Sequence, residues 1–265
     1  MAQSMQMART MQERETGSGL VGGVDAGRRG SAPAWILAIT KTQPGASAEF
    51  KSYPSFGELW EDAKAGGLLV VAVDMPMGLP KAADRWRHCE ERARGRLGEK
   101  RAAAVFPAPP LCALDAADHA EADRLAVEAG GNRLSGDTYR LLEKCRDVRG
   151  TIDPAAFSSS ARPRVAEVHA EVCFWELSGK KPTRYKKRSE RGQADRLRLL
   201  SSHFSGIDAT VEESAGAPPE GVMRRYDMLD AAVAAWTARR IASDNAERLG
   251  NDERDESGFP MSIWI

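Results

Sequence analysis

The sequence of 265 residues has no two cysteines close together, no long apolar run and no excess of charge of either sign. Its four cysteines form no C-x-x-C pair and match no zinc-binding spacing, so reduced thiols in a cytosolic protein are the simplest interpretation. No apolar run approaches the length of a membrane span, and the polar N-terminus lacks the apolar centre of a secretory signal. We therefore expect a cytoplasmic protein with no membrane partner, and a disordered tail or a misplaced start codon over residues 1–19.

Charge and length set limits on the class of protein. The 38 basic residues equal the 38 acidic residues, so overall charge argues neither for nor against a nucleic-acid partner, and local clusters have to decide. A hydrophobic content of 42% suffices for a core, and the length suits one large domain or a domain with an insertion. We expect a single domain over residues 20–265.

The first apolar segment of the chain ends in Asp25, and Gly27 and Gly30 follow. This pattern predicts a strand with a carboxylate at or near its C-terminal end, followed by a tight turn. A carboxylate in that position lies at the edge of a sheet, where α/β proteins usually place their chemistry. The alternative interpretation is a turn aspartate without function.

A second aspartate follows a second apolar segment. The continuous run 68–74, which ends in Asp74, predicts a strand buried on both faces. A helical crossover before it makes this strand a candidate to lie parallel beside the first, with Asp25 and Asp74 side by side. Between the two, apolar or alternating segments and a capping box predict strands over 34–39 and 48–53 and a helix over 55–65.

The segment 81–162 has a different composition and predicts a helical insertion after the fourth strand. Its elements are predicted as helices over 82–97, 116–129 and 134–148, with an extended segment over 104–110. Beyond it we expect a short strand over 164–169, a helix over 190–203, a loop over 215–221, a helix over 226–241, a mobile polar segment over 244–257 and an extended end over 259–265.

The last helix carries Asp227 and Asp230, which are three residues apart and share one face of its first turn. If they meet Asp25 and Asp74, several carboxylates converge, and each raises the pKa of the others unless cations neutralise them. Ligand sets made only of oxygen favour Mg²⁺ or Mn²⁺. Two such ions would activate a water and stabilise the leaving oxygen in phosphodiester hydrolysis.

Several motifs in order resemble the domain-of-unknown-function family 429, over roughly residues 20–243. They are Val21–Asp25, Val73–Pro80, Val105–Pro109, Leu134–Ser135, Glu167–Phe174 and Leu229–Ala238. The resemblance implies a predicted nuclease with a ribonuclease H-like α/β fold, a mixed sheet flanked by helices. The D-x-x-D start of the last helix is also similar to that of Holliday-junction resolvases.

Two positions depart from the pattern that we expect of this family. Ala170 stands where proline is expected, and Arg225 and Tyr226 stand where acidic residues are expected. The second departure bears on which residues bind metal.

Site residues follow from the residues and the resemblance together. We expect Asp25 to bridge two metal ions, Asp74 to bind one, and Asp230, or alternatively Asp227, to complete the other. Glu167 is expected as a fourth ligand or a catalytic base.

Two residues near Glu167 are also considered for the site. His169 is expected either to orient a water or shuttle a proton, or to pack at a strand end. For Glu171 we favour a structural role.

A basic segment without an acidic residue extends from Lys180 to Arg188. It predicts a nucleic-acid contact through Tyr185, Lys186, Lys187 and Arg188, in which cations bind phosphates and the tyrosine stacks on a base. The alternative is a solvated charged loop.

Two other functions remain open on the sequence alone. One is a scaffold of the same fold that binds nucleic acid or protein without catalysis. The other is an actin-like or sugar-kinase-type phosphotransferase, in which the turn after Asp25 would hold phosphates, although the chain shows no second copy of the fold. The substrate of a nuclease is equally open among RNA, DNA, a branched junction and a small phosphodiester.

Overall fold

The computed structural model describes residues 19–29, 32–82, 86–216 and 223–265. The predicted tail lies outside this part of the chain except for Gly19, as does most of the predicted loop over 215–221. Within the described residues, no helix is long and apolar enough to cross a membrane.

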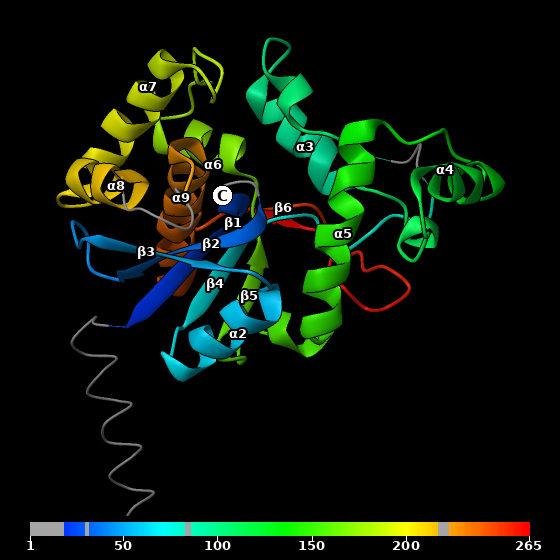
Figure 1. Cartoon of the computed structure of the whole chain (residues 1–265), viewed down its shortest axis with the longest axis horizontal. Coiled ribbons are helices and arrows are strands. Elements are labelled where there is room, and N and C mark those ends of the chain that lie inside the picture. The colour runs from blue at the N-terminus through cyan, green and yellow to red at the C-terminus, as the bar shows by residue number, and fades with distance from the viewer. Residues whose placement is uncertain (1–18, 30–31, 83–85, 217–222) are drawn as a thin grey trace, which may run out of the picture.

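A five-stranded mixed sheet has the strand order β3-β2-β1-β4-β5 (Figure 1). The first three strands pair antiparallel, whereas β4 pairs parallel with both β1 and β5. Asp25 and Asp74 are partners in the β1–β4 register, which confirms that they lie side by side. The strands are β1 (Leu20–Arg29), β2 (Ala32–Lys41), β3 (Ala48–Tyr53), β4 (Val70–Asp74) and β5 (Arg164–Glu167).

The predicted tight turn after Asp25 is wrong at Gly27, because β1 continues to Arg29. The ten-residue strand β2 provides partners for β1 beyond the point where β4 ends at Asp74. Gly27 instead permits a close approach, since a Cβ atom there would lie 2.8 Å from a carboxylate oxygen of Asp227.

Helices cover both faces of the sheet (Figure 1). Side chains that alternate along each strand divide the core in two. In β4, Val70 and Ala72 face one cluster and Val71 and Val73 face the other, as expected for a strand buried on both faces. The first cluster includes α6 (Ala170–Leu177), α7 (Glu190–Ser201), α8 (Ile207–Gly216) and α9 (Arg225–Ala242), and the second includes α2 (Phe56–Ala65) and α5 (Gly136–Thr151).

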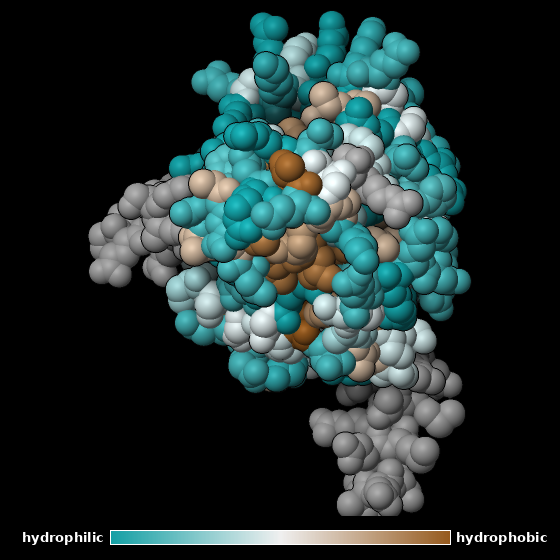
Figure 2. Space-filling model, turned by 90° about the vertical axis from the view of Figure 1, so that its right-hand side faces the viewer, coloured by the Kyte–Doolittle hydropathy of each residue, from teal (hydrophilic) through white to brown (hydrophobic). Residues whose placement is uncertain are grey.

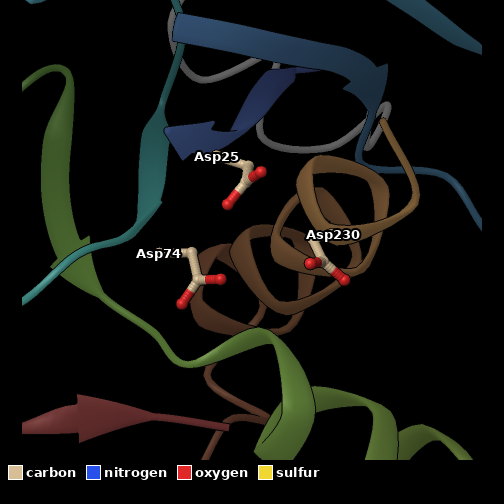
Figure 3. A group of neighbouring side chains, drawn as sticks. All are labelled: Asp25, Asp74 and Asp230. Carbon is tan, nitrogen blue, oxygen red and sulfur yellow. The ribbon is translucent and has the colours of Figure 1, made fainter. Parts of the chain in front are cut away.

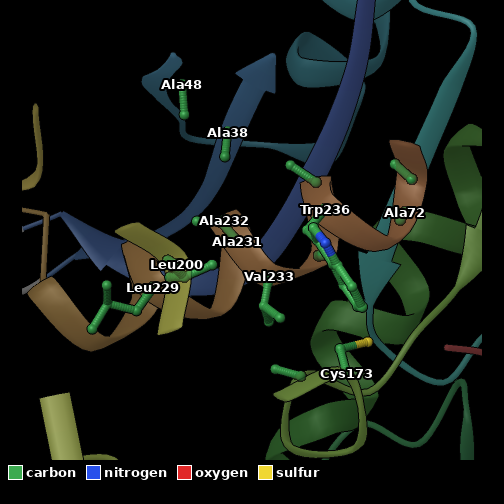
Figure 4. Packing of buried hydrophobic residues seen from close by; sticks show 14 of the residues in the cluster. Ala38, Ala48, Ala72, Cys173, Leu200, Leu229, Ala231, Ala232, Val233 and Trp236 are labelled. Carbon is green, nitrogen blue, oxygen red and sulfur yellow. The ribbon is translucent and has the colours of Figure 1, made fainter. Parts of the chain in front are cut away.

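Helix α9 is the central helix of the first face, and every residue from Asp227 to Arg239 is buried. Its small side chains let it lie directly on β1 (Figure 4). A Cβ atom on Gly23 would lie 1.9 Å from the Ala235 nitrogen and 2.2 Å from the Ala231 oxygen. The helix and the strand are therefore in backbone contact at this point.

The segment between β4 and β5 is helical, as predicted, although its helices are shorter or shifted. Among the described residues, the predicted helix over 82–97 begins at His88, and residues 83–85 of that prediction lie outside the described part of the chain. The helices are α3 (His88–Leu97), α4 (His119–Glu128) and α5, with 3₁₀ turns η1 (Ala102–Ala104), η2 (Leu111–Ala113) and η3 (Pro154–Phe157). The surface on the side of α4 and α5 is mostly hydrophilic, with a small apolar area at its centre (Figure 2).

The prediction that residues 244–257 form a mobile segment is wrong. Residues Arg248–Leu249 form β6, which pairs with β7 (Ile263–Trp264) in a second small sheet. The Asp255 carboxylate is 1% exposed, lies 2.5 Å from an Arg149 guanidinium nitrogen and accepts a hydrogen bond from the Leu79 amide. The ion pair holds the segment against α5, and the hydrogen bond from Leu79 holds it against the turn that follows β4.

We predict that Gly23→Ala destabilises the protein by about 1–3 kcal/mol or more, because the new methyl group overlaps the α9 backbone. Gly95→Ala is the matched control, because Gly95 lies in α3 with no atom within 4 Å of an added Cβ, so stability should stay equal or rise by up to about 1 kcal/mol. Urea unfolding measures both. Equal stability of the two variants would contradict the backbone contact.

Candidate metal centre

Three carboxylates from three different elements meet at one edge of the sheet (Figure 3). Asp25 comes from β1, Asp74 from the end of β4, and Asp230 from the first turns of α9. One oxygen of each lies within 4.8 Å of the others. This distance permits a single cation to contact all three.

Strand alternation and helix position explain why these side chains converge. Along β1 and β4, residues two apart share a face, so Asp25 lies on the face of Val21, and Asp74 on that of Ala72. Both side chains therefore point toward α9, whose start places Asp230 opposite them.

Burial and mutual repulsion raise the pKa of the site carboxyls. The pKa of Asp25 is well above its ordinary value because burial disfavours its charge, and Asp230, Asp227 and Asp74 add to this, whereas Lys187 opposes it. Burial also raises the pKa of Asp74, which His169 partly counteracts. Without a bound cation, the ionised site is electrostatically unfavourable.

Lys187 is the one member of the predicted phosphate-binding group that enters the acidic cluster. Its ammonium nitrogen lies 2.5 Å from an oxygen of Asp230, and its side chain remains 41% exposed. The attraction of Asp230 raises the pKa of Lys187 above the ordinary value in spite of desolvation. Lys187 thus serves as an internal counterion.

A buried hydrogen-bond network fixes the start of the basic segment. Glu171 accepts hydrogen bonds from Arg101, from the Thr183 hydroxyl and, at 2.6 Å, from Arg196 of α7. Burial alone would raise the pKa of Glu171, but Arg196, Thr183 and Arg101 together lower it. The structural role expected of Glu171 fits this arrangement, which links the insertion to the segment that carries Lys187.

Glu167 lines the same cleft as the carboxylate triad, but it is not among the three residues whose oxygens lie within 4.8 Å of one another. In β5 it shares a face with Val165, which packs against the second core cluster, away from α9. Its oxygens accept hydrogen bonds at 2.6 and 3.0 Å from Arg87 and at 2.8 Å from the Met77 amide. The expected metal ligand is thus a buried partner of an arginine.

Two other predicted residues lie at the border of the site. Asp227 is buried against Gly27 and adds to the negative potential at Asp25, but the group within 4.8 Å does not include it. His169 precedes α6 and lies beside Asp74, and its Nδ1 is buried with no hydrogen-bond partner among the described residues.

Asp25 lines two clefts, which have volumes of about 670 and 760 Å³. The first contains Asp74 and Asp230, and the second contains Asp227 and Tyr226. Lys186 and Lys187 line both clefts, and Arg188 lines the second.

The aromatic residues that line the two clefts are not the one that the sequence predicted. Tyr185 is in neither cleft, and its ring lies 5.5 Å from the Arg184 guanidinium and 5.9 Å from that of Arg191. Sequence reasoning missed Tyr226 and Phe106 as cleft residues. An aromatic residue within the predicted extended segment 104–110 was the available signal for Phe106.

Fold and site together define an α/β protein with a candidate metal centre of three carboxylates. The chain belongs to the family described as "Protein of unknown function (DUF429)", whose model matches residues 23–255. The family expectation is thereby confirmed. No curated protein and no solved structure matches the chain.

We predict that Asp25→Asn stabilises the metal-free protein at neutral pH, by about 0.5–2 kcal/mol, a range usual for stabilising substitutions. A carboxyl whose pKa is raised by folding destabilises the folded state as pH rises above its ordinary pKa, and asparagine removes that charge. The advantage should vanish in acid, where aspartate is protonated in both states. Thermal unfolding from about pH 2.5 to 8 measures it, since the ordinary pKa of the aspartate is 3.8.

The exposed Asp208 of α8 provides the control, since Asp208→Asn should not change stability in this pH-dependent way. Addition of Mn²⁺ at 100 times its Kd should stabilise the wild type by about 2.7 kcal/mol and Asp25→Asn by much less. Loss of stability in metal-free Asp25→Asn would show that the ionised carboxylate of Asp25 does not destabilise the folded state.

Proposed function

We propose that this protein is a divalent-metal-dependent nuclease that hydrolyses phosphodiester bonds. The observation that carries the proposal is the triad of buried Asp25, half-buried Asp74 and buried Asp230, with ligand oxygens within 4.8 Å. Side chains brought together from two strands and a helix contribute no apolar packing there and repel one another. A bound cation gives this arrangement a physical reason.

The donor set favours Mg²⁺ or Mn²⁺, because every ligand is a carboxylate oxygen. Lys187 supplies only one positive charge against three carboxylates, which leaves room for a divalent ion. Asp25 is central among the acidic residues, with Asp74 and Asp230 on one side and Asp227 toward the second cleft. A second ion bridged by Asp25, with Asp230 or alternatively Asp227 as its other ligand, remains our expectation.

Metal ions in such a site lower the pKa of a bound water and polarise a phosphoryl oxygen. The chain supplies the other parts. The carboxylates of Asp25, Asp74 and Asp230 would hold the ion, and His169, beside Asp74, is placed to orient a water or accept its proton. Lys187 competes with a cation for Asp230 and, when displaced, is within the cleft to bind a phosphate.

The order of the strands supports a ribonuclease H-like fold for this nuclease. An antiparallel meander β1–β3 is followed by parallel β4 and β5, and helix α9, which carries Asp227 and Asp230, crosses the face of the sheet. This agrees with the predicted resemblance of the chain. A non-catalytic scaffold of the same fold is the alternative that the first experiment tests.

We expect Mn²⁺-dependent cleavage in a panel of single-stranded, duplex, hybrid and branched nucleic acids. Asp25→Asn, Asp74→Asn and Asp230→Asn should each lower the rate by about 100-fold or more, since each removes part of a charge stabilisation of several kcal/mol. Asp208→Asn should cleave like the wild type. If the wild type cleaves nothing and does not bind Mn²⁺, the scaffold alternative replaces the nuclease.

Lys187→Gln should bind Mn²⁺ about 10-fold more tightly than the wild type, because the competing ammonium is absent from Asp230. Isothermal titration calorimetry measures the change. The control is Lys181→Gln, which removes an exposed charge from the same segment. Weaker binding by Lys187→Gln alone would mean that the ammonium supports the metal site instead of competing with the ion.

A further inference from the structure

Phe106 is an aromatic residue that the fold leaves half-exposed. Its exposed fraction is 50%, and among the described large hydrophobic residues only Val127 of α4 is comparably exposed. Phe106 lines both clefts that contain Asp25, whereas Val127 lines neither. The exposed ring is thus located at the junction of the two halves of the candidate site.

The backbone on both sides of Phe106 is fixed. The Val105 carbonyl accepts a hydrogen bond at 3.0 Å from Arg94, and the Ala108 amide donates one at 2.9 Å to Glu90. Val105 and Ala108 are themselves buried, and Pro107 restricts the chain between them. The ring is therefore held at the cleft by its neighbours, and its exposure does not result from a loose segment.

Basic side chains line both clefts. Lys100 lines the first, Lys186 lines both, and Arg224 and Arg140, the latter paired with Asp137, line the second. Cations along a groove with an aromatic ring between them are the features by which proteins bind single-stranded nucleic acid, because phosphates follow the cations and a base stacks on the ring. A paired base would not offer its face to Phe106 without unstacking.

We infer that Phe106 is a stacking platform for an unpaired base next to the phosphate at the triad, and that the substrate is a single-stranded nucleic acid. The inference rests on the proposed function, since it places the scissile phosphate at Asp25. The two clefts would receive the strand on either side of that phosphate. A small phosphodiester would leave one of them unused.

The test measures binding of a single-stranded oligonucleotide that contains the fluorescent base 2-aminopurine, in the Asp25→Asn background, in which we expect cleavage to be strongly slowed. Phe106→Ala should weaken binding by about 5- to 150-fold, as expected for loss of one base–aromatic stack. It should also abolish the quenching of 2-aminopurine that accompanies stacking. Phe106→Trp should keep both, and Val127→Ala, the equally exposed control, should change neither.

An oligonucleotide with one abasic position extends the test. When the abasic position lies at Phe106, this strand should bind to the Asp25→Asn protein as weakly as the intact strand binds to the variant that also carries Phe106→Ala. Adding Phe106→Ala should not weaken the binding of the abasic strand any further. Urea unfolding verifies that Phe106→Ala is folded, as expected for an exposed side chain.

Equal affinity and equal quenching in Phe106→Ala would overturn the inference, as would a duplex that binds more tightly than the single strand. Neither result would affect the nuclease proposal, which depends on Mn²⁺-dependent cleavage and its loss in Asp25→Asn. Quenching that depends on Phe106, in a protein that cleaves nothing, would instead support the platform and reject the nuclease.

Discussion

Repulsion among three carboxylates, two of them buried and one half-buried, is the constraint on which the rest of the structure depends. Asp25, Asp74 and Asp230 have little water to screen them, and the folded state must hold them together against this repulsion. The energy comes from the apolar face of α9, which packs on β1 with backbone contact at Gly23. The packing and the site are therefore a single feature, because a helix moved away from β1 would take Asp230 with it.

The insertion between β4 and β5 contributes to the site through charge as well as shape. Arg101 of the insertion and Arg196 of α7 meet at Glu171, and Thr183 joins them at the start of the basic segment. This network determines where the segment leaves α6 and so brings Lys187 to Asp230. Through these contacts, a change in the insertion would alter the position of Lys187 relative to Asp230.

Local patterns predicted the sheet and the triad well, because their signals lie within a few residues. The apolar run before Asp74 and the crossover before it were sufficient to place Asp74 beside Asp25. The role expected of Glu167 did not take account of its face, which follows from alternation with Val165 and puts its carboxylate against Arg87. The order of residues 244–257 and the inward direction of Lys187 depend on partners far away in sequence, Arg149 and Asp230, which no local pattern reveals.

Two ion pairs near the site differ in a way that separates structure from function. Arg87 and Glu167 are 2% and 3% exposed and share two hydrogen bonds, so neither can leave without abandoning a buried charge. Lys187 meets Asp230 through one ammonium contact and is 41% exposed, so water can solvate it when it leaves. A carboxylate paired with arginine in this way is fixed by the fold, whereas the ion pair of Asp230 is the easier of the two to separate, because water can solvate the released lysine. This difference supports our proposal that Asp230, and not the carboxylate of Glu167, binds the metal ion.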